Sequence, residues 1–155
     1  CEPLIYGGGH ERGLRSGTLN VPSIVGMGVA STFPPDDEVR RMRDQLEHGI
    51  CSQLDGVDIN GHRTQRLANT TNLSFRGVNG DELMKRMPDI ALSSSSACTS
   101  AQLQPSYVLG AIKCSEERIA GSVRFSLGRF NTSKEIEVAT ERVVESVKAL
   151  RDQAS

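Results

Sequence analysis

The chain has 155 residues, of which 37% are hydrophobic and 24% charged, and its formal net charge is −1. This composition is typical of a globular domain with a core of its own. It lacks the concentrated positive charge of a nucleic-acid-binding protein, and no apolar run is long enough to cross a membrane. We therefore expect neither a nucleic acid nor a membrane as a partner.

The four cysteines are spread along the chain, at Cys1, Cys51, Cys98 and Cys114. They form no C-x-x-C pair, so their spacing favours neither a zinc site nor a disulfide framework. The three histidines are dispersed as well. We therefore predict no metal site, and we predict a reducing compartment, the cytoplasm or an equivalent one.

The first residues read as the end of a strand, and the chain does not begin with Met, which together indicate a piece of a longer protein. Residues 7–18, GGGHERGLRSGT, predict a loop, because consecutive glycines disfavour both helix and strand. Asn20, Val21 and Pro22 then open a helix. This helix is apolar on almost every side and is predicted to be buried.

A second helix is predicted over residues 36–54, where apolar side chains recur at helical spacing and should pack on a sheet. Asn79 and Glu82 resemble the capping box of a short helix. The last helix is predicted to be capped by Thr132 and Glu135. Short strands are expected at 57–59, 72–75, 90–92 and 122–127, with short helices after Pro105 and Ser115. A turn at Asn60 and Gly61 and an exposed loop over residues 62–69 are expected after the first strand.

This order predicts an α/β (α+β) domain in which helices cover one face of a short, mostly antiparallel sheet. We expect it to comprise residues 21–155. Residues 1–20 would precede it as a glycine-rich arm.

Three residues are candidates for chemistry. Cys98 lies in the polar stretch SSSSACTSAQLQ, where an exposed thiol is either reactive or an inert linker cysteine. Arg124 lies on the face of its strand opposite the apolar side chains, where it is either simply exposed or directed at an anion such as a carboxylate. Thr18 follows flexible backbone, so its hydroxyl could donate to a phosphate, although the same residues also form an ordinary loop.

Three segments in this order, GGGHERGLRSGT (7–18), ALSSSSACTSAQLQPSYVL (91–109) and SVRFSLGRF (122–130), resemble the C-terminal part of cysteine desulfurases. They are most similar to the group that supplies sulfur for iron–sulfur clusters and tRNA thiolation. The resemblance extends over nearly the whole chain.

The resemblance implies a pyridoxal-phosphate (PLP) enzyme of fold type I that works as a homodimer and converts L-cysteine to L-alanine. Cys98 matches the cysteine that receives the sulfur as a persulfide, within a loop at 93–104. Arg124 matches the arginine that binds the substrate carboxylate. Thr18 matches a threonine that reaches the PLP phosphate of the partner subunit, which puts the arm, residues 1–20, at the dimer interface. A sulfur-acceptor protein, such as an iron–sulfur scaffold, is the implied partner.

The sequence departs from this family at several positions, and two of these departures bear on the expected chemistry. Ser95 stands where the family has glycine, which leaves the geometry of the cysteine loop open. The lysine that holds PLP should follow a Ser-Xaa-His pattern, and none of the four lysines does. We therefore expect the isolated chain neither to bind PLP firmly nor to turn over cysteine.

Three alternatives remain open from the sequence. The chain could be a stand-alone persulfide carrier that uses Cys98, or an interaction module. It could also belong to a selenocysteine lyase, an enzyme with the same architecture.

Overall fold

The computed structural model describes residues 2–33, 37–94 and 106–154. The chain forms two compact units, Cys1–Pro35 and Asp36–Ser155, and each is described by itself. The units divide after Pro35, whereas the sequence suggested a division after residue 20. The first predicted helix therefore makes its contacts within the N-terminal unit.

Over residues 2–33, the N-terminal unit has one 3₁₀ turn, η1 (Glu11–Gly13), and one helix, α1 (Val21–Ala30). Asn20 caps α1 by accepting a hydrogen bond from the Ser23 amide at 3.3 Å. The prediction that this helix is buried is wrong for the described unit, in which no residue of α1 is buried. Its apolar side chains are exposed because η1 and the loop are too small to cover them.

Within residues 37–94 and 106–154, the second unit has two long helices, three short helices and four strands. These are α2 (Asp37–Cys51), β1 (Val57–Ile59), β2 (Thr70–Phe75), α3 (Gly80–Lys85), β3 (Ser93–Ser94), α4 (Tyr107–Ala111), α5 (Glu116–Ala120), β4 (Ser122–Ser126) and α6 (Ser133–Ala154).

The four strands form one antiparallel sheet in the order β1-β2-β4-β3. Its register places Asn72 of β2 and Ser93 of β3 on either side of Arg124 of β4. The predicted position of the third strand, residues 90–92, is wrong, because the strand lies at Ser93–Ser94. Ile90 closes a turn by donating to the Met87 carbonyl, and pairing with β4 begins at Ser93.

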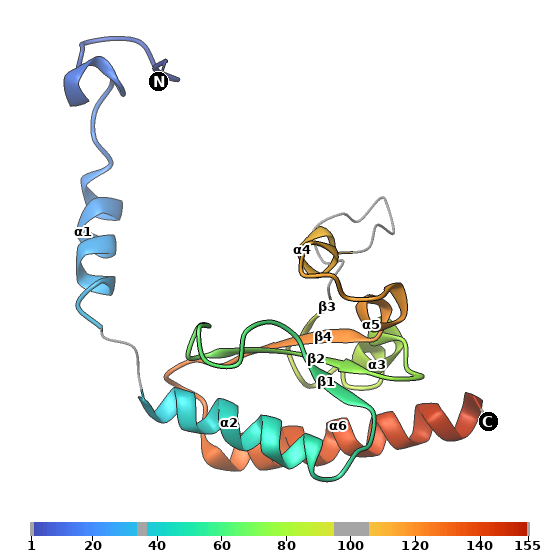
Figure 1. Cartoon of the computed structure of the whole chain (residues 1–155). Coiled ribbons are helices and arrows are strands. Elements are labelled where there is room, and N and C mark those ends of the chain that lie inside the picture. Colours follow the sequence, from blue (N-terminus) through green and yellow to red (C-terminus); the bar gives the residue numbers. More distant parts are fainter. Residues whose placement is uncertain (1, 34–36, 95–105, 155) are drawn as a thin grey trace. The chain divides into compact units, whose positions relative to one another are not determined.

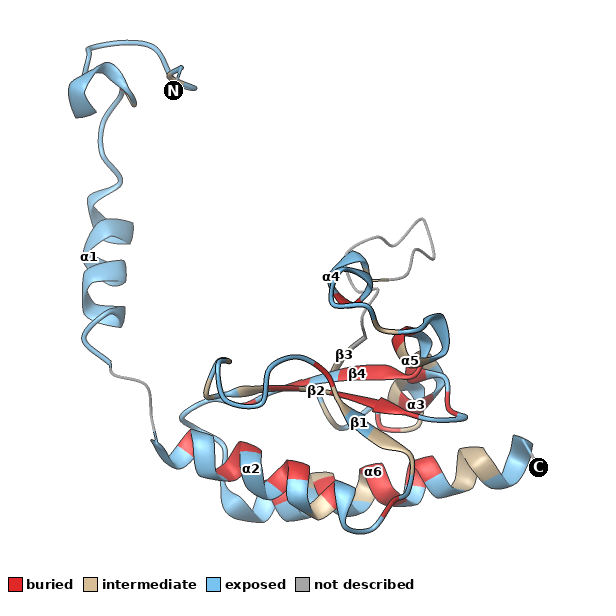
Figure 2. Cartoon of the chain, viewed as in Figure 1, coloured by how far each residue is buried: buried red, intermediate tan, exposed pale blue. Residues whose placement is uncertain are grey.

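The helices α2 and α6 pack together and cover one face of the sheet, while α4 lies on the other side (Figure 1). The predicted apolar face of α2 is confirmed, because its members are buried, as Figure 2 shows for the helix as a whole. They meet the apolar side chains of the central strands, including Leu73, Phe75, Val123 and Phe125. This layer is the core that supports the sheet.

Two of the predicted helix caps are confirmed. Thr132 and Glu135 form a reciprocal capping box, with Thr132 N donating to Glu135 Oε2 at 2.8 Å and Glu135 N to Thr132 Oγ1 at 3.3 Å. The Asn79 side chain accepts from the amides of Asp81 and Glu82. The helices α3 and α6 therefore begin where the sequence indicated.

Candidate active site

The sheet has two chemically different faces. Alternate residues point to opposite faces, and residues opposite each other on paired strands share one face. The face toward α2 and α6 is apolar. The other face carries polar side chains from three strands, namely Asn72 and Ser74 of β2, Ser93 of β3, and Ser122 and Arg124 of β4. We call this set the polar sheet face.

Arg124 is the exposed cation of the polar sheet face. Its Nη2 donates to Ser93 Oγ at 3.3 Å, and its cross-strand neighbour on β2 is Asn72. The buried Val123 and Phe125 beside it hold the strand to the core. The predicted orientation of Arg124, away from the apolar side chains, is therefore confirmed, and its guanidinium is free to bind a planar anion such as a carboxylate.

Cys98 lies outside the described residues, as does Ser95. The structure describes the elements on both sides of this segment. Before it, β3 pairs with β4 beside Arg124. After it, α4 begins with Ser106 as its N-cap, whose hydroxyl accepts from the Leu109 amide at 3.4 Å. The segment that contains Cys98 is therefore continuous with the strand next to Arg124.

Thr18 belongs to the N-terminal unit, separate from Arg124, and it is exposed. Arg15 Nη1 donates to the carbonyls of Gly17 and Thr18, each at 3.0 Å. Ser16 beside it is buried, and its hydroxyl accepts from the Gly9 amide at 3.2 Å. The loop around Thr18 is thus held by its own hydrogen bonds, with the threonine on its surface.

Asn60 joins the polar sheet face to the segment between α4 and α5, and sequence reasoning took it only as part of a turn. It is 7% exposed. Its Nδ2 lies 2.6 Å from Asn72 Oδ1, 2.7 Å from Ser74 Oγ and 3.0 Å from Ser122 Oγ. Its partners are 12 to 62 residues away in the sequence, so no local pattern could have revealed the network.

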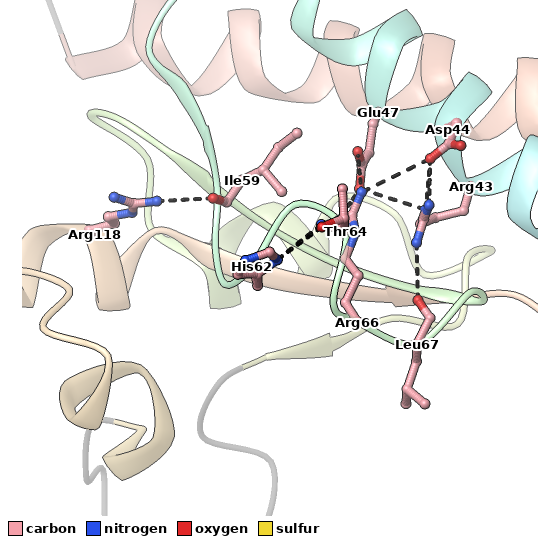
Figure 3. Close-up of polar contacts among 9 residues, drawn as sticks. All are labelled: Arg43, Asp44, Glu47, Ile59, His62, Thr64, Arg66, Leu67 and Arg118. Carbon is pink, nitrogen blue, oxygen red and sulfur yellow. Dashed lines mark hydrogen bonds and ion pairs between the residues drawn. The ribbon is translucent and has the colours of Figure 1, made fainter.

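A cluster of charges fixes the loop after β1 to α2 (Figure 3). Arg66 donates to both carboxylate oxygens of Glu47, at 2.5 and 2.8 Å. Arg43, which is 5% exposed, donates to the Leu67 carbonyl at 3.0 Å. Burial raises the pKa of Glu47, but the hydrogen bonds and the positive charges of Arg66 and Arg43 outweigh it and hold the pKa below its usual value. The loop expected to be simply exposed is therefore tied down.

The two described cysteines differ from a reactive thiol in their surroundings. Cys51 is exposed, but partial burial of its thiol and the charge of Glu47 raise the thiol pKa, which disfavours the thiolate. Cys114 is half-buried, and its Sγ lies 3.7 Å from Asn60 Oδ1. Neither thiol has the surroundings of a reactive cysteine. Substitutions of Cys51 and Cys114 are therefore suitable controls for a substitution of Cys98.

The described residues contain no group of three or more His, Cys, Asp or Glu side chains placed to hold a metal ion. For an organic cofactor, the chemistry of the available groups is more informative. Arg124 suits a carboxylate, and the exposed Thr18 hydroxyl suits a phosphate oxygen. The four lysines, Lys85, Lys113, Lys134 and Lys148, are all exposed. The residues present thus include groups that suit the carboxylate of a substrate and the phosphate of PLP, but no lysine in a position suited to hold PLP covalently.

The fold and the arginine-bearing sheet face define an α+β domain of the kind found in PLP enzymes. The aminotransferase class-V family model matches residues 5–138. The chain therefore belongs to this family, whose members depend on PLP.

Relatives and solved structures agree with this assignment. The chain is 46% identical to cysteine desulfurase IscS of Shewanella piezotolerans over 97% of its length, and 46% identical to that of Histophilus somni. A NifS-like protein from Rickettsia africae superposes with a TM-score of 0.79 at 28% identity, covering 95% of this chain and 40% of that one. Another NifS-like protein gives 0.74 at 30% identity, covering 94% of this chain and 38% of that one. The chain spans 39% of the length of the IscS relatives.

No helix among the described residues is both long enough and apolar enough to cross a membrane.

Proposed function

We propose that this chain is the small-domain part of a PLP-dependent cysteine desulfurase, which converts L-cysteine to L-alanine and carries the sulfur as a persulfide on Cys98. The strongest support is the position of Arg124. It is an exposed guanidinium on the polar sheet face, beside the strand that continues into the segment with Cys98. The 46% identity to IscS desulfurases supports the same activity.

Arg124 binds the substrate carboxylate through parallel hydrogen bonds, as guanidinium groups do. Ser93 orients it by accepting from Nη2. Because β4 is held by ladders on both sides, Arg124 offers a fixed reference point for the amino acid. The bound amino acid then lies on the polar sheet face and not in the apolar core.

Bound PLP supplies an electron sink that weakens the bond between carbon and sulfur in the substrate. Cys98, as a thiolate, attacks the substrate sulfur. A sulfur–sulfur bond forms and the carbon–sulfur bond breaks, with its electron pair remaining on carbon. That carbon takes a proton and alanine leaves, so Cys98 retains the sulfur as a persulfide.

The proposal extends to the N-terminal arm and to partners. Thr18 donates its hydroxyl to the PLP phosphate of the partner subunit in a homodimer, and residues 1–20 line that interface. The persulfide is passed to a sulfur-acceptor protein such as an iron–sulfur scaffold. A reducing compartment such as the cytoplasm suits this chemistry, because a thiolate must be regenerated after each transfer.

The direct test uses the full-length protein with L-cysteine, and measures alanine and the mass of the peptide that contains Cys98. We expect alanine, a mass gain of one sulfur on that peptide, and loss of both in Cys98→Ser. Cys51→Ser and Cys114→Ser are the matched controls and should retain both. Alanine at the wild-type rate from Cys98→Ser would remove Cys98 from the mechanism. Turnover of selenocysteine without turnover of cysteine would replace the desulfurase assignment by a lyase.

A further inference from the structure

Asn72 and Arg124 occupy the kind of cross-strand position at which side chains approach each other most closely. In the ladder between β2 and β4, the Phe75 amide donates to the carbonyl of the opposite residue, Gly121, at 3.0 Å. Hydrogen-bonded pairs alternate with non-hydrogen-bonded pairs along an antiparallel ladder. Asn72 lies an odd number of residues from Phe75, so its pair with Arg124 is a non-hydrogen-bonded one, with Cα atoms about 4.5 Å apart. The two side chains therefore border the same space on the polar sheet face.

A chain of hydrogen bonds fixes which end of the Asn72 amide is available. Arg118 Nε donates to Asn60 Oδ1 at 2.7 Å. Because an arginine only donates, the oxygen of the Asn60 amide must face it. The nitrogen of Asn60 then faces Asn72 and donates to Asn72 Oδ1 at 2.6 Å. The oxygen of Asn72 is thus engaged, and its Nδ2 is the end that Asn60 does not hold.

Both members of the pair keep unused donors. Nδ2 of the half-buried Asn72 donates to none of the described residues. The buried side-chain atoms without a partner in this part of the chain are Arg66 Nε and Thr71 Oγ1, so Asn72 Nδ2 is accessible. Arg124 gives one hydrogen bond to Ser93, and a guanidinium has further N–H groups to offer. The space between the two side chains therefore presents donors from β2 and from β4.

We propose that Asn72 is a second substrate-binding residue, which donates from Nδ2 to the carboxylate of the amino acid held by Arg124. This deepens the proposed function and rests on it. A carboxylate accepts hydrogen bonds at both of its oxygens, so it can bind both side chains at once. Arg124 supplies the charge, and the amide supplies a donor whose direction Asn60 has already set. The substrate carboxylate is then held from two strands.

The test measures the binding of two ligands to the full-length protein with PLP bound, through the absorbance of the cofactor. The ligands are L-alanine and ethylamine, which is alanine without its carboxylate. Asn72→Ala removes the donor and should weaken binding of L-alanine about tenfold. Asn72→Asp still accepts from Asn60 but brings a second negative charge to the ligand carboxylate, so it should weaken binding further, by about thirtyfold or more. Ethylamine should bind both variants as it binds wild type.

The comparison of the two variants separates substrate binding from a role in stability. If Asn72 only supported the sheet, Asn72→Asp would be the milder change, because it keeps the hydrogen bond from Asn60, and the two ligands would be affected equally. Asn69→Asp is the matched control. Asn69 precedes β2 and donates to the Leu127 carbonyl at 3.1 Å, so this variant adds the same charge away from Arg124. It should leave the binding of L-alanine unchanged.

Either Asn72 variant can decide the question if the other does not fold, because each is judged by the difference between the two ligands. Unchanged binding of L-alanine, or equal losses for L-alanine and ethylamine, would overturn the inference. A milder effect of Asn72→Asp than of Asn72→Ala would overturn it as well. Wild-type protein that forms no alanine from L-cysteine would instead refute the proposed function, so the two failures are distinct.

Discussion

Asn72 and Arg124 lie directly opposite each other on β2 and β4, with their side chains on the polar sheet face. The pair links the two networks of that face. Asn72 accepts from Asn60, and Arg124 donates to Ser93. A single strand pair therefore connects the candidate substrate anchor with Asn60 and its hydrogen bonds.

The first prediction concerns Arg124. Arg124→Lys removes the two parallel hydrogen bonds to a carboxylate while keeping the charge, so KM for L-cysteine in the full-length enzyme should rise about tenfold or more. The Tm should stay nearly constant, because the side chain is exposed. Steady-state kinetics measures KM, and thermal unfolding measures Tm. Arg142→Gln is the matched control, since Arg142 pairs with the exposed Asp89 at 3.3 Å, and it should leave KM unchanged. An unchanged KM in Arg124→Lys would show that the arginine does not bind substrate.

The second prediction concerns the isolated chain of 155 residues. Mixed with PLP and passed through a gel-filtration column, it should emerge without a stable cofactor absorbance band. Its four lysines are exposed, and none follows the Ser-Xaa-His sequence expected for the anchor. Exposed amines react with PLP only reversibly, and this bound fraction is lost on the column. The full-length protein is the positive control. A stoichiometric band in the isolated chain would show that a lysine of this chain holds the cofactor.

Much of the fold follows from local sequence patterns. The apolar spacing of α2, the alternation of β4 and the capping box at Thr132 each involve residues within one turn or one strand, and each is confirmed. Arg124 could be placed for the same reason, since its orientation depends only on the alternation of its own strand. The strand predicted at 90–92 lies at Ser93–Ser94 in the structure, because a short apolar run does not show where pairing with the neighbouring strand begins.

Long-range contacts could not be inferred in this way. Asn60 reads as part of a turn, yet its partners come from β2, α5 and β4. The burial of α1 is predicted from composition alone. An apolar surface indicates that a helix packs against another surface, but it does not identify that surface. Arg66 reads as part of an exposed loop, although Glu47 on α2 fixes it.

The third prediction concerns the ion pair of Glu47 and Arg66. Both side chains are largely buried, at 10% and 14% exposure, so Glu47→Gln should lower the free energy of unfolding by about 2 kcal/mol at neutral pH. The pKa of Glu47 is lowered on folding from its ordinary value of 4.5. Its contribution is therefore fully present above that value and is lost as the pH falls through the lower, folded pKa.

Denaturant unfolding of wild type and Glu47→Gln at several pH values between about 7 and 3 measures this contribution, because protonation of the wild-type carboxyl removes the charge that the variant lacks. The difference in stability should be constant at neutral pH and should shrink below about pH 4.5. A difference that stays constant down to pH 3 would show that charge pairing is not its cause.

The fourth prediction concerns Gly121, where α5 meets β4. A Cβ at this position would lie 2.6 Å from the Phe75 carbonyl oxygen and 2.9 Å from that of Val78. Both are backbone atoms, and the Gly121 carbonyl itself accepts from the Phe75 amide at 3.0 Å, so the backbone at Gly121 cannot move away from the end of β2 freely. Gly121→Ala should therefore cost about 2 kcal/mol of stability through overpacking.

Gly110 is the matched control for this substitution. It lies within α4, where an added Cβ meets nothing within 4 Å. Because alanine favours helix over glycine, Gly110→Ala should raise stability by about 0.5–1 kcal/mol. Thermal and denaturant unfolding of the two variants should therefore shift in opposite directions. A Gly121→Ala protein as stable as wild type would mean that β2 and the end of α5 are less closely apposed than the carbonyl contacts indicate.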